Sequence, residues 1–339
     1  MSSNPTVVVF GAYGHTGRFV VAELLRRGWT PILSGRDAAK LADLAAANPG
    51  LEARPASIDD PEALDRALAG AAAVINCAGP FASTATAVID AALRARIHYL
   101  DVAAEVEVAS STVDRYAGPA TAAGIAIVPA AAFYGGLADL LATAAMGDLP
   151  AADEIAIAYA LDSWQPTQGT VATGVVSDSR REGKRLVFSG GRLALRSDEA
   201  PITQRTYPAP FGTQRVQAEF ITADSVTLPQ HLKAPEISTF MTLAPLEDLS
   251  GPDLTPATGL RSAQQFLVEV IVRSGDNEHR AVARGQDIYA VTAPIVVEAT
   301  RRLLESPTRP AGVITVGGIS DSADFLRSLG SEHFTVEYP

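Results

Sequence analysis

A chain of 339 residues, 47% hydrophobic and 19% charged, is long enough for two domains that each have a core. Its formal net charge of −11 argues against a nucleic-acid partner and against an anionic membrane surface. A single cysteine, Cys77, and the lack of a basic N-terminal leader or of an apolar stretch of about 18 residues favour a soluble, cytoplasmic protein.

The first predicted elements are a strand, a glycine-rich turn and a helix. Val7–Phe10 is a short apolar run, typical of a strand buried on both faces of a parallel sheet. Glycines at G-x-x-G-x-x-G spacing follow, with Ala12 where the commoner G-x-G-x-x-G pattern begins, and an amphipathic segment starts at Arg18. Such turns also occur for structural reasons, but between a strand and a helix they favour a pyrophosphate site at the helix N-terminus. The predicted contacts are Gly11, Tyr13, Gly14, His15, Thr16 and Gly17.

The residues after the second predicted strand, Pro31–Ser34, indicate which cofactor binds. A carboxylate in this place accepts from the ribose 2′-OH of NAD, whereas an arginine suits the 2′-phosphate of NADP. Arg36, together with Ser34 and Lys40, favours NADP. Asp37 keeps NAD open, although it is more typical of a cap on the next helix. The alternative for Arg36 is a solvated loop charge.

Strands and helices then alternate as far as about residue 130, a rhythm that predicts a doubly wound parallel sheet. Ligands bind beyond the carboxyl ends of the strands in such a sheet. We therefore expect the adenine at Ser57 and Ile58, and another part of the cofactor beside Cys77, Ala78, Gly79 and Pro80. The predicted strands are Leu51–Ala56, Ala72–Asn76, His98–Asp101 and Ile125–Pro129.

Beyond residue 150, strands follow one another without helices, which indicates a second domain of the α+β type. Phe266–Arg273 and His279–Gly285 form a predicted hairpin across a Ser-Gly-Asp-Asn turn, and Pro245–Pro256 is a predicted loop. The predicted fold class is α/β, a Rossmann-type doubly wound parallel sheet with a second α+β domain. Its segments are an NADP-binding domain (1–130), a substrate or dimerisation domain (131–285) and C-terminal helices that return to the first domain (286–339).

Four segments carry a family resemblance: residues 11–18 (GAYGHTGR), 34–41 (SGRDAAKL), 74–81 (VINCAGPF) and 98–105 (HYLDVAAE). Together they resemble the saccharopine dehydrogenase-like NAD(P)-binding oxidoreductases, a grouping that includes trans-acting enoyl reductase-like proteins. The resemblance covers most of the chain and is strongest in its first 140 residues. It implies a nicotinamide-cofactor Rossmann domain, an inserted second domain and often a dimer. It does not imply saccharopine as the substrate, because the grouping is broad.

One departure from this pattern concerns the expected nicotinamide pocket. Relatives commonly read Gly-Phe-Asp-Ser-x-Pro-Ser-Asp after the sixth strand, and this chain has AFYGGLAD at residues 132–139. Tyr134 and Gly135 thus replace an acid and a serine, so the family's pocket chemistry does not carry over.

Hydride transfer needs a substrate placed against the nicotinamide and sometimes a proton donor. Tyr134 is the first candidate donor, and the alternative is a tyrosine packed between the domains. Asp101 and Glu105 follow the fifth strand and could contact substrate, whereas His231 could line the pocket from the second domain or lie on the surface. Cys77 is more typical of a small residue under the nicotinamide than of a nucleophile. No tyrosine is followed by lysine four residues later, and no metal-ligand spacing occurs, so no metal is expected.

The sequence therefore predicts an NADP-dependent oxidoreductase that acts on a C=N, C=C or C=O bond of a small metabolite. It is expected to form a homodimer without nucleic-acid or membrane partners. The alternative is a non-catalytic NADP-binding sensor or regulatory protein, because no proton donor is unambiguous.

Overall fold

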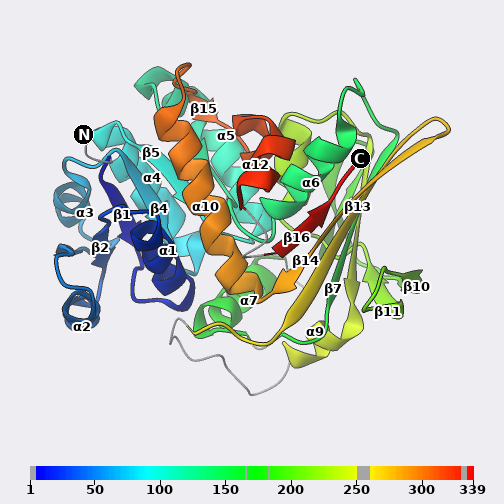
Figure 1. Ribbon diagram of the computed structural model, residues 1–339, viewed down its shortest axis with the longest axis horizontal. Coiled ribbons are helices and arrows are strands. Elements are labelled where there is room, and N and C mark those ends of the chain that lie inside the picture. Colours follow the sequence, from blue (N-terminus) through cyan, green and yellow to red (C-terminus); the bar gives the residue numbers. More distant parts are fainter. Residues whose placement is uncertain (1–4, 165, 182–183, 250–259, 330–333) are drawn as a thin grey trace.

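A seven-stranded sheet forms the part of the molecule that contains the N-terminus (Figure 1). The computed structural model describes residues 5–164, 166–181, 184–249, 260–329 and 334–339. All strand pairs in this sheet are parallel, in the order β15-β6-β5-β4-β1-β2-β3. The strands are β1 (Val7–Phe10), β2 (Ile32–Gly35), β3 (Ala53–Pro55), β4 (Ala73–Asn76), β5 (His98–Asp101), β6 (Ala126–Val128) and β15 (Gly312–Val313).

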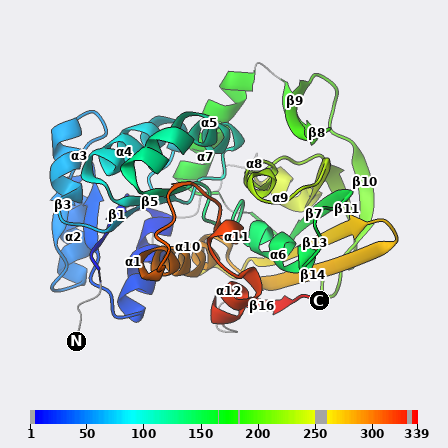
Figure 2. The same cartoon turned by 90° about the horizontal axis from the view of Figure 1, so that it is seen from above.

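Helices cover both faces of this sheet, as Figure 2 shows. Along β1, Val7 and Val9 face one apolar cluster and Val8 and Phe10 face the other, which explains why the run has no polar residue. The first cluster includes α1 (His15–Arg26), α2 (Ala38–Ala47) and α10 (Ile288–Glu305); the second includes α3 (Pro61–Leu68), α4 (Phe81–Ala95) and α5 (Val106–Ala123). The predicted Rossmann-type doubly wound sheet is confirmed, and its strand order reverses between β1 and β4, where such sheets bind ligands.

The second sheet has seven strands in the order β10-β11-β12-β7-β13-β14-β16. Among the strand pairs that the structure describes in this sheet, only β12 and β7 are parallel, so the sheet is mixed, as expected for a second α+β domain. The predicted hairpin is confirmed, with Ser274 opposite Asn277 at its turn. The strands are β7 (Glu154–Leu161), β10 (Ile202–Thr206), β11 (Thr213–Ala218), β12 (Glu236–Thr242), β13 (Gln265–Ser274), β14 (Asn277–Gln286) and β16 (Phe334–Glu337).

Smaller elements surround this second sheet. Helix α6 packs against β13 and β14, and α12 packs against α6. A separate two-stranded sheet, β8 and β9, follows α7 in the chain. These elements are α6 (Leu137–Met146), α7 (Gln168–Arg181), β8 (Arg185–Ser189), β9 (Arg192–Arg196), α8 (Asp224–Thr227), the 3-10 turn η1 (Leu228–Gln230), α9 (Leu243–Asp248), α11 (Val316–Ile319) and α12 (Ser322–Leu329). No described helix is both long and apolar enough to cross a membrane.

Several elements differ from the sequence prediction. Helix α9 occupies the start of the predicted loop Pro245–Pro256, because a proline is compatible with the first turn of a helix; residues 250–259 lie outside the described part. Helix α6 was not predicted, since its apolar residues surround it and leave no helical period. The segment 286–339 joins both domains and not only the first. Its strand β15 belongs to the parallel sheet, whereas its strand β16 pairs with β14 of the second sheet.

A buried ion-pair network joins α1 to α10. The Glu298 side chain is 2% exposed and lies 2.5 Å from Arg27, 2.6 Å from Arg301 and 2.7 Å from Arg302. Burial alone raises the pKa of Glu298, but hydrogen bonds from the three arginines outweigh it and lower the pKa to about 2. The network thereby holds α10, whose first turns reach the site described below.

Glu298→Gln is expected to lower the free energy of unfolding at pH 7 by about 3 kcal/mol. The folded pKa lies below the ordinary value of 4.5, so this stability is complete above pH 4.5 and disappears as the pH falls toward 2. Urea unfolding at pH 7 and pH 3 measures the difference, which should shrink at pH 3. Glu305→Gln, which removes an exposed partner of Arg301, is the control and should change stability by less than about 1 kcal/mol. Equal effects of the two variants would contradict the prediction.

Candidate functional site

A cavity of about 890 Å³ begins at the carboxyl ends of β1 and β4 and continues toward the second sheet. One end is lined by the turn after β1, by the segment after β2 and by residues 57–59 after β3. The other end is lined by Phe133 and Tyr134, by Trp164 and the start of α7, and by the first turns of α10. The cavity therefore lies at the position where open α/β sheets bind ligands.

The glycine turn brings three chain segments into close contact. A Cβ atom on Gly17 would lie 2.2 Å from the Gly11 carbonyl oxygen, and one on Gly11 would lie 2.8 Å from the Ala78 nitrogen. Gly14 precedes α1, and no side chain caps this helix. The helix N-terminus is thus available to an anion, and its dipole favours one. Gly11, Tyr13, Gly14, His15 and Thr16 line the cavity, whereas Gly17 does not and acts through packing.

The segment after β2 brings positive charge to the same end. Arg36 and Lys40 are exposed side chains that line the cavity. The Lys40 ammonium lies 5.7 Å from the centre of the Tyr13 ring, and the Tyr13 hydroxyl accepts a hydrogen bond from the Asp37 nitrogen (3.2 Å). Asp37 caps α2 by accepting from the Lys40 nitrogen (3.1 Å), which confirms its predicted capping role.

Ser34, a predicted cofactor contact, does not reach the cavity. It is fully buried, its hydroxyl donates to the Arg54 carbonyl oxygen (2.8 Å), and it does not line the cavity. Because side chains alternate along β2, the side chain of Ser34 is buried and does not reach the cavity. Arg36 and Lys40 are then the predicted polar contacts of this segment that line the cavity.

The other predicted cofactor contacts fall at the same cavity, with one exception. Ser57, Ile58, Cys77, Ala78 and Gly79 line it, and Pro80 does not. Burial, with the nearby Asp101 carboxylate, raises the pKa of the Cys77 thiol. The thiol therefore stays protonated, in agreement with a packing role rather than a nucleophilic one.

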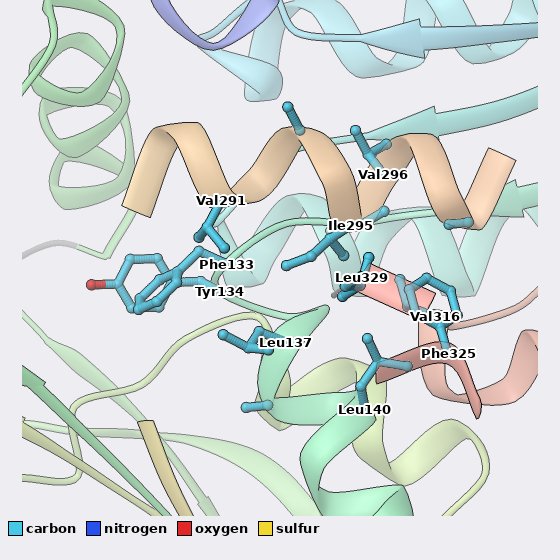
Figure 3. Close-up of a cluster of buried hydrophobic side chains, with 14 of the residues drawn as sticks. Phe133, Tyr134, Leu137, Leu140, Val291, Ile295, Val296, Val316, Phe325 and Leu329 are labelled. Atoms are coloured by element: carbon cyan, nitrogen blue, oxygen red, sulfur yellow. The ribbon is translucent and has the colours of Figure 1, made fainter. Parts of the chain in front are cut away.

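Tyr134 lies at the far end of the cavity, in the turn between β6 and α6. It is 6% exposed, and its ring contacts those of Phe133, Tyr159 and Trp164 at centroid distances of 4.9, 5.0 and 5.6 Å. In Figure 3 its hydroxyl oxygen points away from the other labelled apolar side chains. This hydroxyl is buried and has no hydrogen-bond partner among the described residues. Burial raises the pKa of Tyr134, so the phenol stays protonated and can donate a hydrogen bond.

Asp101 does not line the cavity and has a structural environment. It is fully buried, and it accepts hydrogen bonds from the Ala130 nitrogen (2.8 Å), the Ala103 nitrogen (3.0 Å) and the Tyr99 hydroxyl (3.0 Å). Burial raises the pKa of Asp101 to about 6 despite these bonds. The carboxylate fixes the backbone that leads to Tyr134, so the structure supports a positioning role rather than the expected contact with substrate.

His231 is also placed away from the cavity. Its ring nitrogens lie 2.9 Å from the Thr143 hydroxyl, 3.0 Å from the Thr315 hydroxyl and 3.2 Å from the buried Asp139 carboxylate. These contacts join η1 to α6 and to the segment before α11. His231 therefore does not line the cavity, contrary to the expectation. Its position is set by contacts between segments that are far apart in the chain.

Two side chains at the far end extend the sequence prediction. Trp164, which follows β7, lines the cavity and donates through its indole nitrogen to the Tyr289 hydroxyl (3.0 Å). Tyr289 was missed, although the helix start at Asp287, which accepts from the Tyr289 nitrogen (2.9 Å), was a usable signal.

Glu105 is the one buried carboxylate among the described lining residues. It is 5% exposed and accepts from the nitrogens of Phe81 (3.0 Å) and Ala104 (3.1 Å), and Thr173 of α7 bonds to it as well. Burial raises its pKa. Its bonds therefore fix the start of α4 and hold α7 against the cavity.

Comparisons with known proteins agree with this geometry. Residues 7–128 match the family model of the saccharopine dehydrogenase NADP binding domain. Over 142 residues, 38% of this chain, the sequence is 30% identical to a probable mitochondrial saccharopine dehydrogenase-like oxidoreductase of Arabidopsis thaliana, and this match spans 31% of that protein's length. The chain also superimposes on apo saccharopine dehydrogenase (L-Glu forming) of Saccharomyces cerevisiae with a TM-score of 0.67 and 11% identity, covering 99% of this chain and 100% of the other.

The family model and the Arabidopsis relative confirm the resemblance to saccharopine dehydrogenase-like oxidoreductases that residues 11–105 carry. The yeast structure shows a shared fold. The predicted homodimer, the cytoplasmic location and the substrate stay predictions.

Proposed function

We propose that this protein is an NADP-dependent oxidoreductase that transfers a hydride to or from a C=N, C=C or C=O bond of a small molecule. The observation that supports it is one continuous cavity that is lined by an uncapped helix N-terminus, by three cations (Arg18, Arg36 and Lys40) and by a buried phenol. The NADP-binding family model over residues 7–128 agrees with the first half of this description.

The chemistry of the residues that line this cavity supports a dinucleotide as its ligand. The turn Gly11–Gly17 and the uncapped N-terminus of α1 would hold the pyrophosphate, and Arg36 and Lys40 would bind the 2′-phosphate. Ser57 and Ile58 would contact the adenine, and Cys77–Gly79 would lie along the nicotinamide half. When bound, NADPH supplies the hydride. Tyr134 would hold the substrate by a hydrogen bond and supply the proton, because its protonated hydroxyl has no other partner among the described residues.

Isotope transfer tests the proposal directly. NADPH deuterated at C4 is incubated with a panel of ketones, enones and imines, and deuterium in the reduced product is measured by mass spectrometry. Transfer to a member of the panel is the expected result. Tight NADPH binding without transfer to any of them would overturn the catalytic proposal and leave a binding protein.

Arg36→Ala is expected to weaken NADPH binding by about 10- to 100-fold and NADH binding by less than about twofold, because only NADPH carries the 2′-phosphate. Isothermal titration calorimetry with both cofactors measures the two changes. Arg66→Ala, which removes an exposed arginine on α3 outside the cavity, is the matched control. Equal losses for the two cofactors would reject the phosphate contact.

A further inference from the structure

The far end of the cavity is mainly aromatic. Phe133, Tyr134, Trp164 and Tyr289 line it, together with Ile288 from α10. Phe133, Tyr134 and Trp164 are 2%, 6% and 8% exposed, so their positions are set by packing. A wall of this kind gains energy from planar or apolar ligands, since aromatic side chains bury large areas and stack on π systems.

The positive charge in the cavity is confined to the opposite end. Arg18 donates to the Tyr13 carbonyl oxygen (3.1 Å), and Arg36 and Lys40 belong to the segment after β2. In the part of the far wall that the structure describes, the lining residues include no lysine or arginine. A substrate carboxylate bound there would lose its hydration without gaining a counter-ion, which is strongly unfavourable.

Most polar side chains of the far wall already bond to one another. The Tyr289 hydroxyl contacts the Trp164 indole nitrogen at 3.0 Å and the Thr170 hydroxyl at 2.9 Å. The Thr170 hydroxyl also lies 3.0 Å from that of Thr167, and the Thr292 hydroxyl accepts from the Phe133 nitrogen and donates to the Ile288 carbonyl oxygen. Glu105 is likewise engaged by backbone nitrogens.

The Tyr134 hydroxyl differs from these groups. It is buried and lacks a hydrogen-bond partner among the residues that the structure describes. A buried hydroxyl left unpaired costs about 1–3 kcal/mol, so a ligand that offers one acceptor atom recovers this energy. The wall therefore combines apolar contact with one hydrogen bond from the protein.

We propose that the substrate of this site is a neutral, largely apolar carbonyl compound, such as an aryl ketone or an α,β-unsaturated ketone, whose oxygen accepts from Tyr134. The inference rests on the proposed function, since it takes the glycine-turn end of the cavity as the cofactor's place. Amino acids and keto acids are excluded as good ligands, because the described far wall offers their carboxylates no cation.

A binding experiment with two matched ligands tests this inference. The chain has two tryptophans, and Trp29 is buried in the apolar core outside the cavity, so Trp29→Phe leaves Trp164 as the fluorescent reporter. The protein is saturated with NADP+, whose binding is first measured by calorimetry, and titrated with 4-phenylbutan-2-one or with 4-(3-oxobutyl)benzoate. The second ligand differs by one carboxylate. The neutral ketone is expected to bind at least about 10-fold more tightly.

Two variants sharpen the comparison. Tyr134→Phe should weaken binding of the ketone by about 3- to 10-fold, because it removes a buried donor that has no partner among the described residues. Gln168→Arg places a cation on an exposed lining position at the start of α7, and should strengthen binding of the carboxylate while leaving the ketone nearly unchanged.

The outcomes separate this inference from the proposed function. If NADP+ binds and the carboxylate binds as well as the ketone or better, or if neither ligand binds up to its solubility limit, the inference is overturned and the cofactor assignment stands. If NADP+ itself does not bind, the proposed function fails and the inference falls with it.

Discussion

Replacement of Tyr134 by phenylalanine is expected to lower the rate of hydride transfer by about 100- to 1000-fold, the lower part of the range that one positioned proton donor contributes. The affinity for NADPH should change by less than about twofold, because the residues that would bind the phosphates belong to the turn after β1 and the segment after β2, whereas Tyr134 follows β6. Single-turnover oxidation of NADPH, with the ketone or enone reduced fastest by the unaltered protein, measures the rate, and calorimetry measures the affinity.

Tyr134→Phe is expected to lower the rate without lowering the stability of the protein. The hydroxyl that it removes is buried and has no partner among the described residues, whereas the ring that it keeps makes the contacts with Phe133, Tyr159 and Trp164. Tyr134→Phe should therefore leave the melting temperature unchanged or raise it, since an unpaired buried hydroxyl is unfavourable.

Tyr289→Phe is the matched control for Tyr134→Phe. Tyr289 lines the same cavity, but its hydroxyl already contacts Trp164 and Thr170. We expect a rate loss below about 10-fold and a lower melting temperature, because two partners lose a hydrogen bond. An unchanged rate in Tyr134→Phe, or equal losses in the two variants, would remove Tyr134 as the proton donor.

The cofactor end of the site could be predicted from the sequence because its signals are local. A strand, a glycine turn and a helix lie within about thirty residues, and Arg36 follows the next strand. Ser34 was predicted as a cofactor contact but does not line the cavity, because it lies within β2 and its hydroxyl donates to the Arg54 carbonyl oxygen. Successive residues of a strand point to opposite faces, so a position that lines the cavity and one that lies in the core can be neighbours in the sequence.

The substrate end could be predicted only in part because its residues come from distant segments. Tyr134 follows β6, Trp164 follows β7, and Tyr289 begins α10 after the hairpin of β13 and β14. Asp101 was predicted at the correct edge of the sheet, yet its bond to the Ala130 nitrogen turns it away from the cavity. His231 was given a lining role from its neighbourhood in the chain, and its actual partners, Asp139 and Thr315, lie 84 or more residues away.

Gly17→Ala is expected to weaken NADPH binding by at least about 100-fold, a larger loss than that of any single polar contact in the cavity. The added methyl group would lie 2.2 Å from the Gly11 carbonyl oxygen and 3.0 Å from Cα of Ala12, which are backbone atoms that cannot rotate away. Helix α1 must then move from β1, and the helix N-terminus and the turn no longer face the pyrophosphate together. Calorimetry with NADPH measures the affinity, and circular dichroism establishes whether the fold is retained.

Gly118→Ala supplies the control, because the same methyl group there meets no atom within 4 Å. Gly118 is exposed in α5 and lies outside the cavity, so this variant should bind NADPH normally. Pro119 follows it in the helix and disfavours a helical residue with a Cβ before it, so the melting temperature of this variant should not rise. If Gly17→Ala unfolds, NADPH in large excess should not restore its structure, because the distorted turn lacks the binding geometry. Normal NADPH affinity in a folded Gly17→Ala protein would show that the close contact of α1 with this turn is not what binds the cofactor.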